Sequence, residues 1–280
     1  MRRALALTAK WLGFGLLIVV LTGLTQIGGL ILVLAWLATR IWRRRSGRLI
    51  ATIVLFCVTY AVVSVWIVPP LAAAGGRQAL PCTLQDDAPV RPQSLLYCIL
   101  NRHYASPRVA EMLDALAADL SQSYPGIQVA YLDASFPFFD GFPLPPHLSH
   151  DDGRKIDLPL YYRDDPGPPS AVATPSPIGY FGFEQPRPGD PQPCAGRNDL
   201  ITLRWDFDWI QGLLPTRSLD EGATALLVRW FVVNAEAYGV ERVLLEPHLQ
   251  RRLGVEAEQV RFQGCRAARH DDHIHVQIRP

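Results

Sequence analysis

Residues 269–280 read RHDDHIHVQIRP, and this stretch predicts the strand around which the fold is organised. Successive side chains of a strand point to opposite faces, so residues two positions apart share a face. One face would be apolar and would pack on a core, whereas a disordered polar tail would not need the alternation. The alternating residues are Ile274, Val276 and Ile278 on the apolar face and His273, His275 and Gln277 on the polar face.

Helical and strand patterns follow one another irregularly upstream of this strand. Apolar residues at helical spacing predict a helix over 107–121, and GIQVAYLDA predicts a strand from Gly126. The capping box SLDE predicts a buried helix over 218–238. A strand over 240–246 and a short helix over 248–254 follow. This order indicates an α+β domain with a central, mostly antiparallel sheet and flanking helices.

The first 69 residues have the composition of a membrane anchor. They carry eight Arg and Lys residues and no acidic residue, which leaves 19 basic and 26 acidic residues in the remainder. Without a basic surface in that remainder, nucleic acid is not an expected partner. The uncharged runs over 11–38 and 49–68 are each long enough to cross a hydrocarbon core of about 30 Å. We therefore expect two transmembrane helices, a linker and N-terminal extension over 70–106, and a domain over 107–280.

The positive charges of the anchor predict its orientation. Five arginines lie between the two apolar runs, against three cations near the N-terminus. The positive-inside rule then places the connection in the cytoplasm and both termini outside. The expected location is the bacterial inner (cytoplasmic) membrane, with the domain in the periplasm or outside.

The cysteines of the polar part form an even set, while Cys57 lies inside the second apolar run. Four cysteines suit two disulfides in an oxidising compartment, and three pairings are open. The alternative is four free thiols in a cytosolic domain. The four residues are Cys82, Cys98, Cys194 and Cys265.

The segment between Arg163 and Asn198 is too rich in Pro and Gly to form a helix or a sheet. A structureless stretch of this length in a compact domain is usually functional or disordered. Because Cys194 would tether its far end, we favour an ordered loop that borders a cleft.

Five of the seven histidines fall in two clusters, PHLSHDDGRKIDL from Pro146 and the C-terminal stretch, whereas His103 and His248 are expected to be structural. In the first cluster His150 and Asp157 flank Gly153, which permits a tight turn. Two imidazoles and one carboxylate are a common catalytic zinc set, since three protein ligands leave a fourth position open. The alternative is a polar loop between strands.

The pattern H-x-x-G-x-x-x-D, followed far downstream by H-x-H, resembles the zinc peptidases that group lysostaphin, D-Ala-D-Ala peptidases and the hedgehog fold. The closer resemblance is to the penicillin-insensitive murein endopeptidases. It implies that His150, Asp157 and His275 bind zinc and that His273 is the catalytic histidine beside the attacked carbonyl. His147 and His270 resemble additional site histidines, which would bind substrate or support the ligands.

Four charged residues near these motifs allow two interpretations. Asp271 and Asp272 either orient the imidazoles or are solvated turn residues. Arg154 and Lys155 stand where the resembled family usually has small or apolar residues. They either engage an acidic peptide or face solvent.

The expected function is a membrane-anchored zinc metallopeptidase that hydrolyses amide bonds in peptidoglycan peptides. A second hypothesis is a cell-wall binding module that keeps the metal without turnover. A third hypothesis, a domain without metal, predicts that His150, Asp157 and His275 lie far apart.

Overall fold

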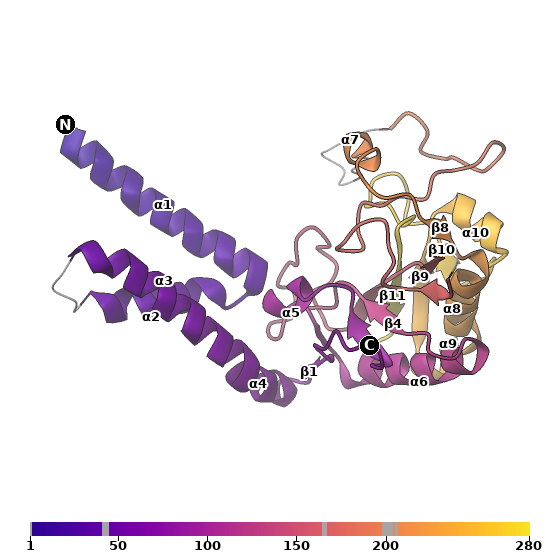
Figure 1. Cartoon of the computed structure of the whole chain (residues 1–280), viewed down its shortest axis with the longest axis horizontal. Helices are drawn as coiled ribbons and strands as arrows, with labels where there is room; N and C mark the ends of the chain where they lie inside the picture. The colour runs from indigo at the N-terminus through magenta and orange to yellow at the C-terminus, as the bar shows by residue number, and fades with distance from the viewer. Residues whose placement is uncertain (1, 41–44, 164–166, 198–203, 205–206) are drawn as a thin grey trace.

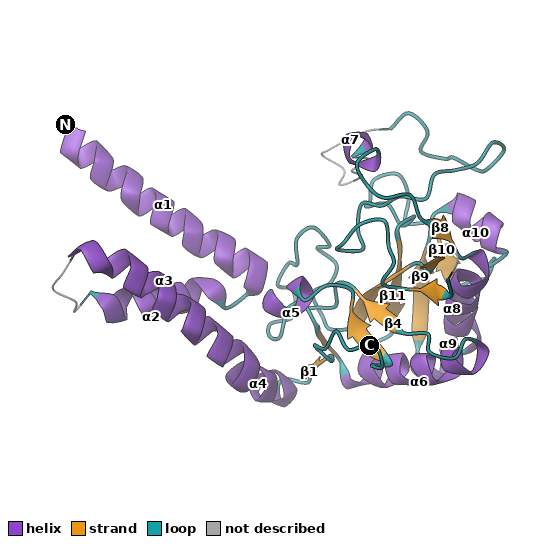
Figure 2. Ribbon diagram, viewed as in Figure 1, coloured by secondary structure: helices purple, strands orange, loops and turns teal. Residues whose placement is uncertain are grey.

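The computed structural model describes residues 2–40, 45–163, 167–197, 204 and 207–280. An N-terminal arm of helices leads into an α+β domain with mixed, mostly antiparallel sheets (Figures 1 and 2). The arm consists of α1 (Arg2–Thr25), α2 (Gly28–Thr39), α3 (Arg45–Val62), a π-helical segment (Val63–Ile67) and α4 (Val68–Ala74).

Two segments of the arm are long and apolar enough to cross a membrane, Thr8–Thr25 and Gly47–Ala74. The second contains the predicted helix over 49–68. The prediction of one helix over 11–38 is wrong, because the chain turns between α1 and α2 at Gln26, which has φ 66°. Beyond that turn, a Cβ on Gly29 would lie 2.1 Å from Oγ1 of Thr22. Glycine is thus required for the close approach of α2 to α1.

The helices α1, α2 and α3 run up and down beside one another. The rings of Trp11 and Trp36 lie 5.7 Å apart, so α2 returns along α1. The hydroxyls of Thr39 and Thr52 lie 2.7 Å apart, so α3 in turn runs back along α2. The start of α1, the end of α2 and the start of α3 therefore lie at one end of the arm and the α+β domain at the other (Figure 1).

The central sheet has four strands, and the predicted C-terminal strand lies inside it. β11 pairs antiparallel with β5 on one side and with β9 on the other, while β9 pairs parallel with β10. The strands in spatial order are β10 (Val260–Arg261), β9 (Val240–Leu244), β11 (His273–Ile278) and β5 (Lys155–Pro159).

Helices cover the apolar face of this sheet (Figure 2). Ile274 and Val276 of β11 are fully buried in one core with Leu116 and Phe231 from two of the helices. The burial of such apolar side chains is the main force that holds sheet and helices together. The helices are α6 (Pro107–Ser123), α8 (Glu221–Val233), α9 (Ala235–Tyr238) and α10 (Pro247–Leu253).

The predicted helices over 107–121 and 248–254 are confirmed, but the capping box from Ser218 is wrong. Ser218 and Leu219 form a short strand, β8 (Ser218–Leu219), and the side chain of Asp220 accepts from the backbone N–H of Ala223. The carboxylate is thus the N-cap, one of the preferred residue types at that position. The end of this helical region before Gly239, which has φ 68°, is confirmed.

The segment expected to be a linker contributes to the domain from Gln78 onward. Leu80, Val90 and Tyr97 belong to the main core. Its strand β2 pairs in parallel with β4, which lies within the predicted strand from Gly126. The elements here are β1 (Gln78–Ala79), β2 (Val90–Pro92), α5 (Leu96–Ile99), β3 (Tyr104–Ala105) and β4 (Val129–Tyr131).

Beyond β6 (Tyr162–Arg163) and β7 (Pro169–Ser170), the described residues from Ala171 to Arg197 form neither helix nor strand. The short helix α7 (Asp208–Gln211) lies farther along the chain. The prediction of two disulfides is confirmed, with Cys82 bonded to Cys98 and Cys194 bonded to Cys265. The second bond ties the end of the irregular segment to the residues that precede β11.

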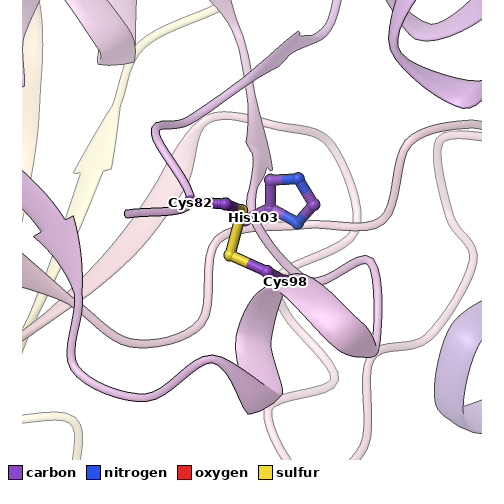
Figure 3. Close-up of side chains that lie close together, drawn as sticks. All are labelled: Cys82, Cys98 and His103. Carbon is purple, nitrogen blue, oxygen red and sulfur yellow. A yellow bond between two sulfur atoms is a disulfide. The ribbon is translucent and has the colours of Figure 1, made fainter. Parts of the chain in front are cut away.

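The first disulfide lies beside His103 (Figure 3). Because both sulfurs are bonded to each other, these cysteines have no thiolate to offer a metal ion. The imidazole of His103 is 6% exposed, and its Nδ1 has no hydrogen-bond partner among the described residues. Burial lowers the pKa of His103 to about 4.

Because of His103, the free energy of unfolding of the domain should therefore decrease as the pH is lowered. The unfolded chain binds a proton at this imidazole below about pH 6.5, whereas the fold resists protonation until about pH 4. Stability present above pH 6.5 is thus lost toward pH 4, by roughly 3 kcal/mol at most. Denaturant unfolding at pH 7.5 and pH 4.5 should show a smaller loss in His103→Phe than in the unaltered protein. Equal losses in the two proteins would contradict this assignment.

Candidate metal centre

Three side chains predicted as metal ligands converge on one point. Nε2 of His150 lies 2.9 Å from Nδ1 of His275 and 3.1 Å from Oδ1 of Asp157. Nδ1 of His275 lies 2.8 Å from the same carboxylate oxygen. His150 and Asp157 are fully buried and His275 is 4% exposed. The third hypothesis expected these residues to lie far apart, and the structure contradicts it on that point.

The pairing of β5 with β11 places two of the three ligands. His275 and Asp157 are direct partners across the antiparallel pair. Residues directly opposite each other project from the same face of a sheet, with Cβ atoms about 4.5–5.5 Å apart.

A glycine turn brings the third ligand, His150, to the start of β5. Gly153 has φ 75°, and its N–H donates to the hydroxyl of Ser135 while its carbonyl accepts from the N–H of Ser106. A Cβ at this position would lie 3.3 Å from the Ser106 nitrogen. Glycine therefore lets the loop fold back over the sheet.

Hydrogen bonds turn the donor atoms of this set inward. Nδ1 of His150 donates to the carbonyl of Ala134 at 2.7 Å, so Nε2 faces the other two ligands. A backbone carbonyl that fixes a histidine in this way is the usual support of a metal ligand. Donors bound tetrahedrally at about 2.0–2.2 Å would lie roughly 3.4 Å apart, so an ion would fit after shifts of a few tenths of an ångström.

The pKa shifts of the three donors differ in direction, and the ionised carboxylate of Asp157 is the group that favours positive charge. Burial lowers the pKa of His275 to about 4. Burial would also lower the pKa of His150, but the carboxylate of Asp157 raises it above its ordinary value. Burial would raise the pKa of Asp157, but His150 and His273 hold it well below its usual range. The carboxylate of Asp157 thus favours positive charge at His150, where the three donor atoms converge.

His273 lies beside this set, two residues before His275 on β11. Its Nδ1 lies 2.5 Å from Oδ1 of Asp272, whose other oxygen accepts from the N–H of Phe181. Its Nε2 is buried and has no hydrogen-bond partner among the described residues. Burial would lower the pKa of His273, but the carboxylates of Asp272 and Asp157 raise it to about 9.

Asp133 and Tyr180 lie on the other side of Asp157, and sequence reasoning missed both. The Tyr180 hydroxyl donates to Oδ2 of Asp157 at 2.7 Å. The carboxylate of Asp133 accepts two hydrogen bonds from Arg102, at 2.6 and 2.7 Å. Nδ1 of His147 lies 3.0 Å from Oδ2 of Asp133. The position of Asp133 near the end of the predicted strand GIQVAYLDA was a usable signal, whereas nothing in the Pro/Gly segment marked Tyr180.

Of the other predicted site residues, His270 and Asp272 contact His273, whereas Asp271 contacts a neighbouring arginine. The ring of His270 is buried with its centroid 5.0 Å from that of His273. Asp271 instead pairs with Arg269, so of the two aspartates Asp272 is the one that orients an imidazole. His248 is buried and lies 2.9 Å, through Nε2, from the carbonyl of Glu184.

The two cations beside the ligand Asp157 pair with neighbouring carboxylates. Lys155 lies 2.8 Å from Asp152 and 3.3 Å from Asp151. Arg154 lies 2.9 Å from Asp152. Both side chains are thus engaged in ion pairs within the loop. The sequence had left two interpretations open, that they bind an acidic peptide or that they face solvent.

The irregular segment closes the centre from one side. A cavity of about 20 Å³ lies next to His273, which is room for one water molecule. Tyr180, Phe181 and Phe183 of that segment line it together with Arg269. A cavity of about 280 Å³ lies farther out, lined by Arg204, Glu246, Arg269 and Asp271 among others. The segment expected to border a cleft therefore lines both cavities.

Comparison of the sequence with known protein families found no matching family, and comparison with curated proteins found no match. The geometry of the centre and the two short motifs therefore carry the functional inference.

Removal of one ligand should abolish tight metal binding at the set formed by His150, Asp157 and His275. We expect the full chain in detergent, reconstituted with zinc and dialysed, to retain the ion, and His150→Ala to bind it more than about 100-fold more weakly. Metal content by mass spectrometry is the measurement. His103→Phe, a buried histidine outside the centre, is the control and should retain the ion. Unchanged affinity for the tightly bound ion in His150→Ala would show that this ion binds outside the set.

Proposed function

We propose that the chain is a membrane-anchored zinc peptidase that hydrolyses amide bonds in peptidoglycan peptides. The observation that carries this proposal is the convergence of His150, Asp157 and His275 beside an uncoordinated imidazole, His273. Imidazole and carboxylate ligands suit zinc, and three of them leave a position for water or substrate. The substrate class comes from the resemblance of the two motifs to the murein endopeptidases.

The residues of the centre supply the parts of a metal-assisted hydrolysis. A bound zinc ion lowers the pKa of its water toward 7 and polarises the carbonyl under attack. His273 lines the cavity that has room for one water, and its buried Nε2 has no hydrogen-bond partner among the described residues. A bound ion would offset the charge of Asp157 that raises the pKa of His273, and Nε2 could then accept a proton from the attacking water and pass it to the leaving nitrogen. Asp272 holds the ring in position through Nδ1 and stabilises its protonated form.

Substrate can reach this centre only after the segment around Tyr180 moves. The ligands are at most 4% exposed, and a cavity of about 20 Å³ does not admit a peptide. The segment is held by the hydrogen bond from Tyr180 to Asp157 and by that from the Phe181 N–H to Asp272. Opening of a lid of this kind is common in hydrolases. The same enclosure favours the second hypothesis, a binding module that keeps the metal without turnover.

Hydrolysis of muropeptides by the zinc-loaded full chain tests the proposal. We expect mass spectrometry of the products to show amide cleavage, and His273→Gln to lower kcat by about 10²–10⁴-fold, the usual contribution of a general base. His273→Gln should retain zinc at the first set, because His273 is not among its ligands. His103→Phe should match the unaltered protein. A zinc-loaded protein that leaves a broad set of muropeptides intact would favour the binding module.

We further propose that α1 and the helical segment from α3 through α4 each cross the membrane, and that the 12-residue α2 returns the chain between them, which revises the expected orientation of the N-terminus. Large apolar side chains of α1 and α3 are exposed, as a membrane would require. The start of α1, which carries the N-terminal cations, lies at the same end of the arm as the helix ends that flank the arginine-rich stretch, opposite the α+β domain. One cytoplasmic side then holds all eight cations, in accord with the positive-inside rule. The disulfides suit a domain on the oxidising side.

Labelling of single cysteines in spheroplasts tests this orientation. In a Cys57→Ser background, a membrane-impermeant maleimide should label Glu111→Cys, on the exposed side of α6, without permeabilisation. A cysteine inserted directly after Met1 should react only after permeabilisation, because the N-terminus lies on the cytoplasmic side. Labelling of both positions in intact spheroplasts would contradict this proposal and support the orientation predicted from the sequence, with both termini outside.

A further inference from the structure

We propose that the centre contains a second divalent-metal site, which shares the carboxylate of Asp157 with the first. Its donors are Oδ2 of Asp157, Nδ1 of His147 and Nε2 of His273. These residues form a second group whose donor atoms lie within 4.8 Å of one another. The inference rests on the metal binding in the proposed function but not on peptidase activity.

The distances in the second set match those of a metal site. Oδ2 of Asp157 lies 3.4 Å from Nδ1 of His147 and 3.6 Å from Nε2 of His273. Donors bound tetrahedrally at about 2.0–2.2 Å lie roughly 3.4 Å apart, so little movement is needed. Each oxygen of Asp157 thus faces a different pair of histidines: Oδ1 faces His150 and His275, and Oδ2 faces His147 and His273.

The nitrogen of His273 gives independent support for a bound cation. Nδ1 of this ring is engaged by Asp272, so Nε2 points toward Oδ2 of Asp157. At 3.6 Å the two atoms are too far apart for a hydrogen bond, and Nε2 has no other partner among the described residues. A buried polar atom without a partner is costly, and a metal ion between the two atoms would satisfy both.

The remaining neighbours leave room for a ligand bond and favour positive charge. Tyr180 donates one hydrogen bond to Oδ2 of Asp157, and a carboxylate oxygen has a second lone pair. Asp133 lies 3.0 Å from Nδ1 of His147 and can supply a fourth oxygen. The buried carboxylate of Asp133 pairs with the guanidinium of Arg102, while those of Asp157 and Asp272 contact imidazoles, so a further cation is favoured.

Occupation of the second site would change the role of His273. A metal ion bound to Nε2 removes the lone pair that accepts a proton in the proposed reaction. If the chain is a peptidase, zinc should therefore activate it up to one equivalent and inhibit it as the second site fills. Binding of zinc at the second site would thus inhibit the centre when zinc is in excess.

Zinc titration of the metal-free full chain in detergent tests the second site without reference to activity. We expect two equivalents per chain, the second bound more weakly, and X-ray absorption at the zinc edge to show a metal–metal distance of about 3.5–4 Å, as in other two-metal sites. His147→Gln should bind one equivalent and lose the metal–metal signal. His275→Ala, which breaks the first set alone, should also bind one equivalent. His103→Phe should bind two.

Three outcomes would overturn the inference. The first is saturation of the unaltered chain at one equivalent. The second is a second equivalent that survives in His147→Gln, which would locate it elsewhere on the chain. The third is two bound ions without the metal–metal signal. Failure of the peptidase proposal gives a different result, two equivalents with the metal–metal signal and no cleavage of muropeptides.

Discussion

The antiparallel pairing of β5 with β11 is the constraint on which the rest of the structure depends. It sets Asp157 opposite His275 on one face, while Ile156 and Val276 anchor the same strands in the core on the other face. Since side chains alternate along a strand, a slip of either strand by one residue would send its own candidate ligand into the core and its apolar residues to the centre. The hydrophobic pattern of these two strands therefore fixes the position of the metal ligands as well as the fold.

The sequence predicted this strand and its ligands because both leave a periodic or spaced pattern. Ile274 alternates with His275, and His150 and Asp157 stand at a fixed spacing around Gly153. The capping box at Ser218 failed because β8 uses that residue, and the next polar residue then caps the helix. The break after α1 was missed because residues 11–38 are apolar throughout, and hydropathy cannot distinguish one long helix from two that pack through Gly29. Tyr180 reaches the centre through an irregular segment, and no periodicity predicts such a contact.

Burial of several carboxylates at the centre costs free energy and favours the binding of a cation. Asp133, Asp157 and Asp272 are all at most 3% exposed, and buried charges are tolerated only when they are paired or bound to a cation. Arg102 neutralises the first of them, and the histidines have to share the remaining negative charge. A centre of this kind is most stable when a divalent ion replaces shared protons. The proposed metal binding would therefore be coupled to folding, because the unfolded chain cannot bring these donors together.

The arm packs against the domain, so it fixes the orientation of the domain as well as tethering it. Val68 and Ala72 of α4 are buried against Tyr104, and Ile27 of the α1–α2 turn packs at the same place. The side-chain oxygen of Gln26 accepts from the N–H of Phe138, and the Tyr60 hydroxyl donates to the carbonyl of Ile99. A flexible linker would let a catalytic domain sweep a volume set by its length. Here the packed contacts hold the domain in one orientation relative to the arm. In the proposed membrane arrangement, the metal centre therefore stays at a fixed height above the bilayer, and only substrate at that height can reach it.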